Sequence, residues 1–172
     1  MATKSITDNP IENVDRLASA PRAICSPLSE LTDFGSNPGE LSGYFYLPEV
    51  ISSSTPLVVV LHGCAQTADD YDHGTGWSQI AKRAGFALVF AEQPASNNAL
   101  QCINWFNSDD IARAGGEAES IAQMTETLVI RHGLNKERVY VTGFSAGGAM
   151  AMAMIVTRPD LFVGGAVIGG LA

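Results

Sequence analysis

The chain has 172 residues, of which 46% are hydrophobic and 16% charged, a composition typical of one folded domain with a substantial core. Its formal net charge of −8 disfavours nucleic acid and anionic membranes as partners, because both favour clustered basic residues and the 10 lysines and arginines are scattered. No apolar segment approaches the roughly 18 residues of a membrane span, and no secretory signal peptide is visible at the start of the sequence.

The amino-terminal segment is predicted to contain a short helix. Asn9 and Pro10 form a capping signal, and apolar residues at helical spacing follow as far as Ala18. We interpret residues 1–30 as an extension and residues 31–172 as the folded domain. Within that domain, residues 31–34 and 44–47 are expected to be antiparallel strands separated by a turn-rich segment.

Four further segments are predicted to be strands, at residues 57–61, 86–91, 138–142 and 163–168. The run at 57–61 is apolar at every position, which is typical of a parallel strand covered on both faces. Between the strands, helices are predicted at 77–84, with Thr75 as the cap and Gly85 as the stop, and over Ile121–Val129, with Gly133 as the stop. The segment after Gly147 is expected to be a central helix that is apolar all round. This alternation predicts an α/β fold with a mostly parallel sheet and helices on both faces.

The pentapeptide Gly143-Phe144-Ser145-Ala146-Gly147 stands between a predicted strand and a predicted helix. Such a strand, turn and helix form the nucleophile elbow of serine hydrolases, in which a strained turn lifts the serine hydroxyl clear of the sheet. Because a chain rich in glycine contains short glycine patterns by chance, an ordinary glycine turn is the alternative. The placement favours Ser145 as a nucleophile.

The oxyanion of an acyl-transfer intermediate needs N–H donors, and two are predicted. One is the amide of Ala146 at the start of the helix, and the other is the amide of Cys64, in the loop that directly follows residues 57–61. We expect the neighbouring His62 to hold this loop without exchanging protons.

Several motifs together make the chain resemble the polyhydroxybutyrate depolymerase-like esterases, a family related to feruloyl and acetylxylan esterases. The likeness runs from about Leu31 to Ala172 and rests on Leu61-His62-Gly63-Cys64-Ala65-Gln66-Thr67, Tyr71-Asp72-His73-Gly74-Thr75-Gly76-Trp77, Cys102-Ile103-Asn104-Trp105-Phe106 and Gly143-Phe144-Ser145-Ala146-Gly147-Gly148-Ala149-Met150. The resemblance implies an α/β hydrolase fold, a Ser-Asp-His triad with Ser145 as the nucleophile, no cofactor, an ester substrate and an extracellular location. It also implies further carboxyl-terminal strands, so we expect this chain to be the amino-terminal part of a larger esterase.

The catalytic acid and base of such a triad are not found in the sequence. Asp160 and His132 each precede a strand, whereas active sites in these sheets lie beyond the carboxyl ends of the strands. His73 is expected in a loop at the correct edge, but we interpret it as part of the loop structure. Removing a triad histidine costs about six decades of turnover. An inactive fragment or a non-catalytic binding module is therefore the alternative to an esterase.

Four further expectations do not concern the triad itself. Both Cys64 and Cys102 follow parallel strands, so a disulfide between them is a reasonable hypothesis. Tyr71, Trp105 and Phe106 form either an apolar wall for the substrate or ordinary core packing. The cysteines lack metal-ligand spacing, and no metal site is expected. Residues 163–168 would form an exposed apolar edge, which predicts self-association.

Overall fold

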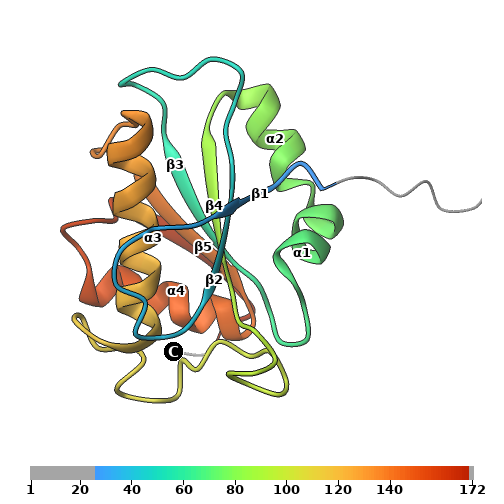
Figure 1. The fold of residues 1–172 in the computed structure, drawn as a ribbon, viewed down its shortest axis with the longest axis vertical. Coiled ribbons are helices and arrows are strands. Elements are labelled where there is room, and N and C mark those ends of the chain that lie inside the picture. Colours follow the sequence, from blue (N-terminus) through green and yellow to red (C-terminus); the bar gives the residue numbers. More distant parts are fainter. Residues whose placement is uncertain (1–25, 171–172) are drawn as a thin grey trace, which may run out of the picture.

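The computed structural model describes residues 26–170, which form a six-stranded sheet in the order β1-β2-β4-β3-β5-β6 (Figure 1). The first three strands in this order pair antiparallel and the remaining pairs are parallel. The strands are β1 Ser29–Leu31, β2 Ser42–Tyr46, β3 Leu57–Leu61, β4 Ala87–Glu92, β5 Val139–Phe144 and β6 Gly164–Ile168. The helix predicted near Ala18 lies outside the described residues, and the division of the chain at residue 30 stays a prediction.

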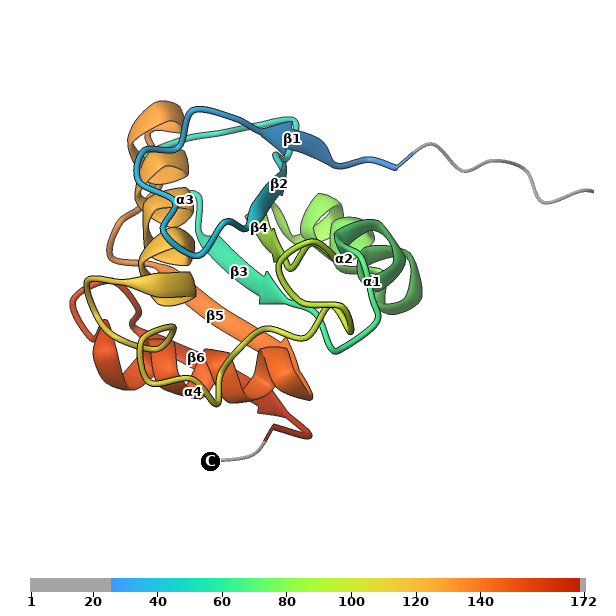
Figure 2. The same cartoon turned by 60° about the horizontal axis from the view of Figure 1, so that its bottom comes forward.

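Helices cover both faces of the sheet, as predicted (Figure 2). The helices are α1 Ala68–Thr75, α2 Trp77–Ala84, α3 Gly116–His132 and α4 Ala146–Thr157. Alternate residues of β4 divide between two cores: Val89 belongs to the cluster under α3 and α4, and Phe90 to the cluster under α1 and α2. The continuous apolar run of β3 follows from this arrangement, because neither of its faces meets water.

Helix α1 was not predicted, and it changes the position of His73. The prediction placed His73 in a loop and Thr75 as the cap of the next helix, whereas Thr75 ends α1 and Gly76 joins α1 to α2 at φ 73°. The residues of α1 are mostly polar, so no apolar periodicity marked the helix. Its start does carry a capping signal, since the Thr67 side chain accepts a hydrogen bond from the Asp70 amide.

Two other predictions differ from the structure in detail. Strand β1 ends at Leu31 instead of extending to residue 34, because Asp33 has the left-handed φ of 54°, which a strand does not accommodate. Helix α4 is apolar all round, but the prediction that it is a central, buried helix was wrong: Met150 and Met154 are buried, whereas Met152 and Val156 are 37% and 69% exposed. Helix α4 rests on the sheet with one face, and its opposite face meets solvent.

Strand β6 is the outer strand of the parallel part of the sheet and pairs with β5 along Tyr140–Phe144. It is largely exposed, with Ile168 at 49% and the preceding Val163 at 56%. The predicted exposed apolar edge is therefore present. Among the described residues, no helix combines the length and hydropathy needed to cross a membrane.

Candidate active site

Ser145 stands at a sharp turn between β5 and α4. It has φ 54° and ψ −118°, a strained conformation for a residue with a side chain, and it is the N-cap of α4. The two glycines of the motif allow this turn: a Cβ on Gly143 would lie 2.2 Å from the Gly147 carbonyl oxygen. The strand, turn and helix of a nucleophile elbow are thus all present.

The segment that follows β3, residues 62–66 (the β3 loop), lies beside this turn. Leu61 and Gly143 are partners in the β3–β5 register, so both strands end at the same edge of the sheet. A Cβ on Gly147 would lie 2.3 Å from the Leu61 carbonyl oxygen, and a Cβ on Gly63 would lie 2.8 Å from the ring of Phe144. The loop and the serine turn are therefore packed backbone against backbone.

Two backbone amides of this arrangement matter for an oxyanion. The Cys64 amide lies between two bonded amides: Gly63 donates to Gln66 Oε1 at 2.9 Å and Ala65 donates to the Leu100 carbonyl at 2.8 Å. None of the hydrogen bonds recorded within residues 26–170 uses the Cys64 amide. Ala146 is the first residue of α4, where amides have no acceptor within the helix.

A disulfide joins Cys64 to Cys102 across 38 residues of sequence. It connects the β3 loop to the segment that follows β4, as does the bond from the Ala65 amide to Leu100. Ala65 itself has φ 59°, in the left-handed region that a residue with a Cβ seldom adopts. The loop is therefore held by covalent and backbone contacts in a conformation it would not adopt alone.

His62 connects the β3 loop to the residue that follows β4. Its ring is 1% exposed, Nδ1 lies 2.7 Å from the Gly63 carbonyl oxygen, and Nε2 accepts a hydrogen bond of 3.0 Å from the Gln93 amide. An Nε2 that accepts leaves the proton on Nδ1, which donates to Gly63. Burial lowers the pKa of His62 and favours this neutral ring. Both nitrogens are used, which supports a structural interpretation.

The other two histidines and Asp160 are placed elsewhere. His73 is exposed on α1, and His132 ends α3, with its ring packed against Phe45 at 5.8 Å between centroids. Asp160 forms an ion pair with Arg113 at 2.9 Å, and this hydrogen bond lowers the pKa of the carboxyl. None of the contacts recorded for the described residues links one of these groups to Ser145.

The three predicted wall residues separate into different environments. Tyr71 is 4% exposed and packs in the core under α1 and α2, which favours the alternative of ordinary core packing. Trp105 is partly buried against the larger core, and its ring meets that of Phe106 edge-on at 6.0 Å. Phe106 is 65% exposed in the segment after β4. A contact with substrate at Trp105 and Phe106 stays a prediction.

Two buried polar residues next to the β3 loop were not predicted. Gln93 and Glu117 are both 0% exposed, and the Gln93 side chain donates to the Glu117 carboxylate. Burial raises the pKa of Glu117 to about 7. A sequence signal existed for Gln93, which directly follows a parallel strand. Glu117 gave none, because an acidic residue in the first turn of a helix is common.

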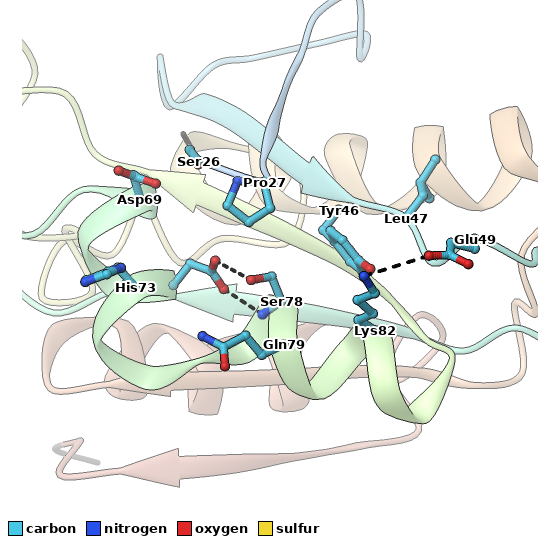
Figure 3. A pocket seen from close by; sticks show the side chains of 11 residues that line it. Ser26, Pro27, Tyr46, Leu47, Glu49, Asp69, His73, Ser78, Gln79 and Lys82 are labelled. Atoms are coloured by element: carbon cyan, nitrogen blue, oxygen red, sulfur yellow. Dashed lines mark hydrogen bonds and ion pairs between the residues drawn. The ribbon is translucent and has the colours of Figure 1, made fainter. Parts of the chain in front are cut away.

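A pocket of about 460 Å³ lies away from Ser145, between β2 and the helix pair α1 and α2 (Figure 3). His73 and Lys82 line it, and the buried Asp72 at its wall accepts hydrogen bonds from the amide and the hydroxyl of Ser78. Asp72 thus caps α2. Within residues 26–170, no three metal-ligating side chains are grouped as a metal would require.

A mostly parallel sheet with helices on both faces and a strained serine at the end of a central strand together define an α/β hydrolase. Residues 41–172 match the model of a protein family described as "Esterase PHB depolymerase". The chain therefore belongs to this family of serine ester hydrolases.

The curated relatives are ester-cleaving enzymes. The chain is 43% identical to poly(3-hydroxyalkanoate) depolymerase C of Paucimonas lemoignei over 83% of its own length and 34% of the relative's. It is 35% identical to acetylxylan esterase A of Emericella nidulans over 84% of this chain and 47% of that protein. It is 33% identical to feruloyl esterase B of Thermothelomyces thermophilus over 89% of this chain and 52% of that protein. The chain therefore spans between a third and about half of the length of these relatives.

A solved structure gives the same result for the fold. The acetyl xylan esterase from Aspergillus awamori superposes with a TM-score of 0.78 at 29% identity, over 84% of this chain and 52% of that one. The expected α/β hydrolase fold is thereby confirmed.

Proposed function

We propose that Ser145 is the nucleophile of a carboxylic ester hydrolase that works through an acyl-enzyme. In the first step the Ser145 hydroxyl oxygen bonds to the ester carbonyl carbon, its proton passes to a base, and the alcohol leaves. Water then releases the acid and restores the serine. The observation that carries the proposal is the strained turn of Ser145 at the start of α4, packed against the β3 loop.

In this proposal the amides of Cys64 and Ala146 bind the oxyanion of the tetrahedral intermediates. The unused Cys64 amide and the position of Ala146 at the positive end of α4 support the assignment. Trp105 and the exposed Phe106 would contact the acyl part of the ester, which the relatives suggest is a hydroxyalkanoate, feruloyl or acetyl group.

A non-catalytic binding module is the second candidate, and the histidines favour it. His62 uses both ring nitrogens within the loop, and neither His73 nor His132 contacts Ser145. Ester turnover by these 172 residues alone would require a base that this arrangement does not show. A base supplied by additional polypeptide would reconcile Ser145 with catalysis.

Turnover of short-chain p-nitrophenyl esters tests the proposal on the 172-residue chain and on a longer natural product that contains it. Ser145→Ala should abolish turnover wherever turnover is found, whereas Ser96→Ala, an exposed serine after β4, should leave it unchanged. Turnover that survives Ser145→Ala would refute the nucleophile. Ester binding without turnover in every preparation would favour the binding module.

The exposed β6 also supports a proposal of self-association. Its outer backbone edge and its apolar side chains, including Ile168 at 49% exposure, are suited to pairing with another strand. Sedimentation should show the 172-residue chain as a dimer or a larger species, and a monodisperse monomer at high concentration would contradict this proposal.

A further inference from the structure

The carboxyl group of Glu117 is fully buried at the start of α3, and both of its oxygens accept hydrogen bonds. Oε1 accepts from Gln93 Nε2 at 2.5 Å, and Oε2 accepts from the Asn104 amide at 2.7 Å. Burying a carboxylate costs several kcal/mol unless it is well bonded. The favourable effect of a negative charge at the N-terminus of α3 does not explain the burial of Glu117, because the partly exposed Glu119 already supplies an acidic side chain to the same turn.

Gln93 connects Glu117 to the β3 loop. Its amide donates to His62 Nε2 at 3.0 Å, and its side-chain nitrogen also donates to the Cys102 carbonyl at 3.1 Å. Its side-chain oxygen accepts from Asn97 at 2.7 Å. Every polar atom of this buried side chain is thereby used, so Gln93 cannot shift without breaking a bond on one of its sides.

The chain of contacts continues into the β3 loop. His62 donates from Nδ1 to the Gly63 carbonyl, and the next residue, Cys64, is bonded to Cys102, whose carbonyl Gln93 also holds. Two routes of hydrogen bonds therefore connect Glu117 to the disulfide, and both pass through Gln93. One continues through His62 toward Cys64, and the other ends at the Cys102 carbonyl.

We propose that Glu117 is a positioning residue for the β3 loop: its carboxylate, acting through Gln93 and His62, holds the Cys64 amide beside Ser145. The consequence for catalysis depends on the proposed function of Ser145. The coupling of Glu117 to the conformation of the β3 loop does not depend on that function.

Protonation of Glu117 should disturb this coupling. Each carboxylate oxygen accepts one hydrogen bond, and an added proton removes the charge that strengthens both bonds and turns one oxygen into a donor. Burial raises the pKa of Glu117 to about 7, which puts this change near neutral pH. The titratable groups around the network are Asp110, whose carboxylate accepts from the Glu117 amide, and His62 and Glu92 on the strand side.

The first test is a pH titration of the wild-type 172-residue chain by NMR, which follows the amides of Gly63 and Ala65. We expect their chemical shifts to change with a midpoint near pH 7. Flat titration curves for both amides between about pH 5.5 and 8.5 would overturn the proposal. This test uses the wild-type protein alone, so its result does not depend on whether a variant folds.

The second test compares Glu117→Gln with Glu126→Gln. The two glutamates lie on the same helix, but Glu126 bonds to Arg158 and has no recorded contact with the β3 loop, so it controls for charge and for lost stability. In Glu117→Gln the transition near pH 7 should disappear, and the Ala65 amide should exchange with solvent about tenfold faster, a local opening made easier by roughly 1.4 kcal/mol. Glu126→Gln should retain the transition.

The outcomes separate this proposal from the function of Ser145. A transition that persists in Glu117→Gln belongs to another group and refutes the role of Glu117, as does an equal response in Glu126→Gln. Where turnover depends on Ser145, Glu117→Gln should lower kcat about tenfold with little change in KM, because oxyanion contacts form in the transition state. Absence of turnover with an intact loop response would count against the proposed function alone.

Discussion

Gly147 and Leu61 lie so close that the first cannot carry a side chain: a Cβ on Gly147 would stand 2.3 Å from the Leu61 carbonyl oxygen. This contact joins the serine turn to the strand that leads into the β3 loop. Ser145, the proposed nucleophile, and the strand that leads into the β3 loop are therefore related by backbone packing, in addition to the side-chain contacts proposed to position the loop.

Gly147→Ala should destabilise the protein by about 1–3 kcal/mol, because the added methyl group meets backbone and the better helix propensity of alanine does not compensate. Gly74→Ala is the matched control, since Gly74 is also helical and has open space around its Cα. The control should gain up to about 1 kcal/mol. Urea unfolding measures both variants, and equal effects would contradict the packing argument.

Loss of the disulfide should destabilise the fold by about 4 kcal/mol, the chain-entropy value for a closed loop of this length. The double variant Cys64→Ser and Cys102→Ser tests this in urea. Reductant should lower the stability of the wild type to that of the variant and leave the variant unchanged. A wild type that is insensitive to reductant would show that the bridge is absent in solution.

The stability contribution of Glu117 should fall as pH rises. Burial raises its pKa from 4.5 to about 7, so the folded protein holds this proton more tightly than the unfolded chain does. The contribution is complete below pH 4.5 and is lost as pH rises through about 7, with a slope of at most about 1.4 kcal/mol per pH unit. The free energy of unfolding of the wild type minus that of Glu117→Gln should decline over this window. Parallel pH curves for the two proteins would contradict the shift.

Arg158 should contribute to stability by joining α3 to α4. Its buried guanidinium pairs with Glu126 at 2.7 Å and with Glu119 at 3.3 Å. Arg158→Ala leaves carboxylates that are partly exposed and can be hydrated, so we expect a loss of about 1.5–3 kcal/mol, the range for hydrogen bonds to charged groups. Arg113→Ala, which removes an exposed pair with Asp160, should cost less than about 1 kcal/mol. Thermal unfolding of the two variants checks this order.

The elements that could be predicted are those whose signal is local. The run Leu57–Leu61 matches β3 at both ends, and Gly85 and Gly133 end their helices in the left-handed conformation, as predicted. Helix α1 was missed because its residues are mostly polar: Tyr71 is its large buried apolar side chain, Thr67 caps its start, and its Asp72 caps the following helix α2. The exposure of Met152 could not be predicted either, because composition does not show which face of a helix has a neighbour.

The sequence by itself determined the order of the strands and of helices α2, α3 and α4, and it placed Ser145 at a turn between a strand and a helix, because burial patterns and glycine conformations act over a few residues. Only the tertiary structure decided what surrounds that serine. Crossovers of the chain bring Cys64 to Cys102 and Gln93 to Glu117, and they move Tyr71 into the core and leave His62 bound within the loop. These relationships depend on which strands become neighbours and on which groups lose water, and both are properties of the assembled sheet.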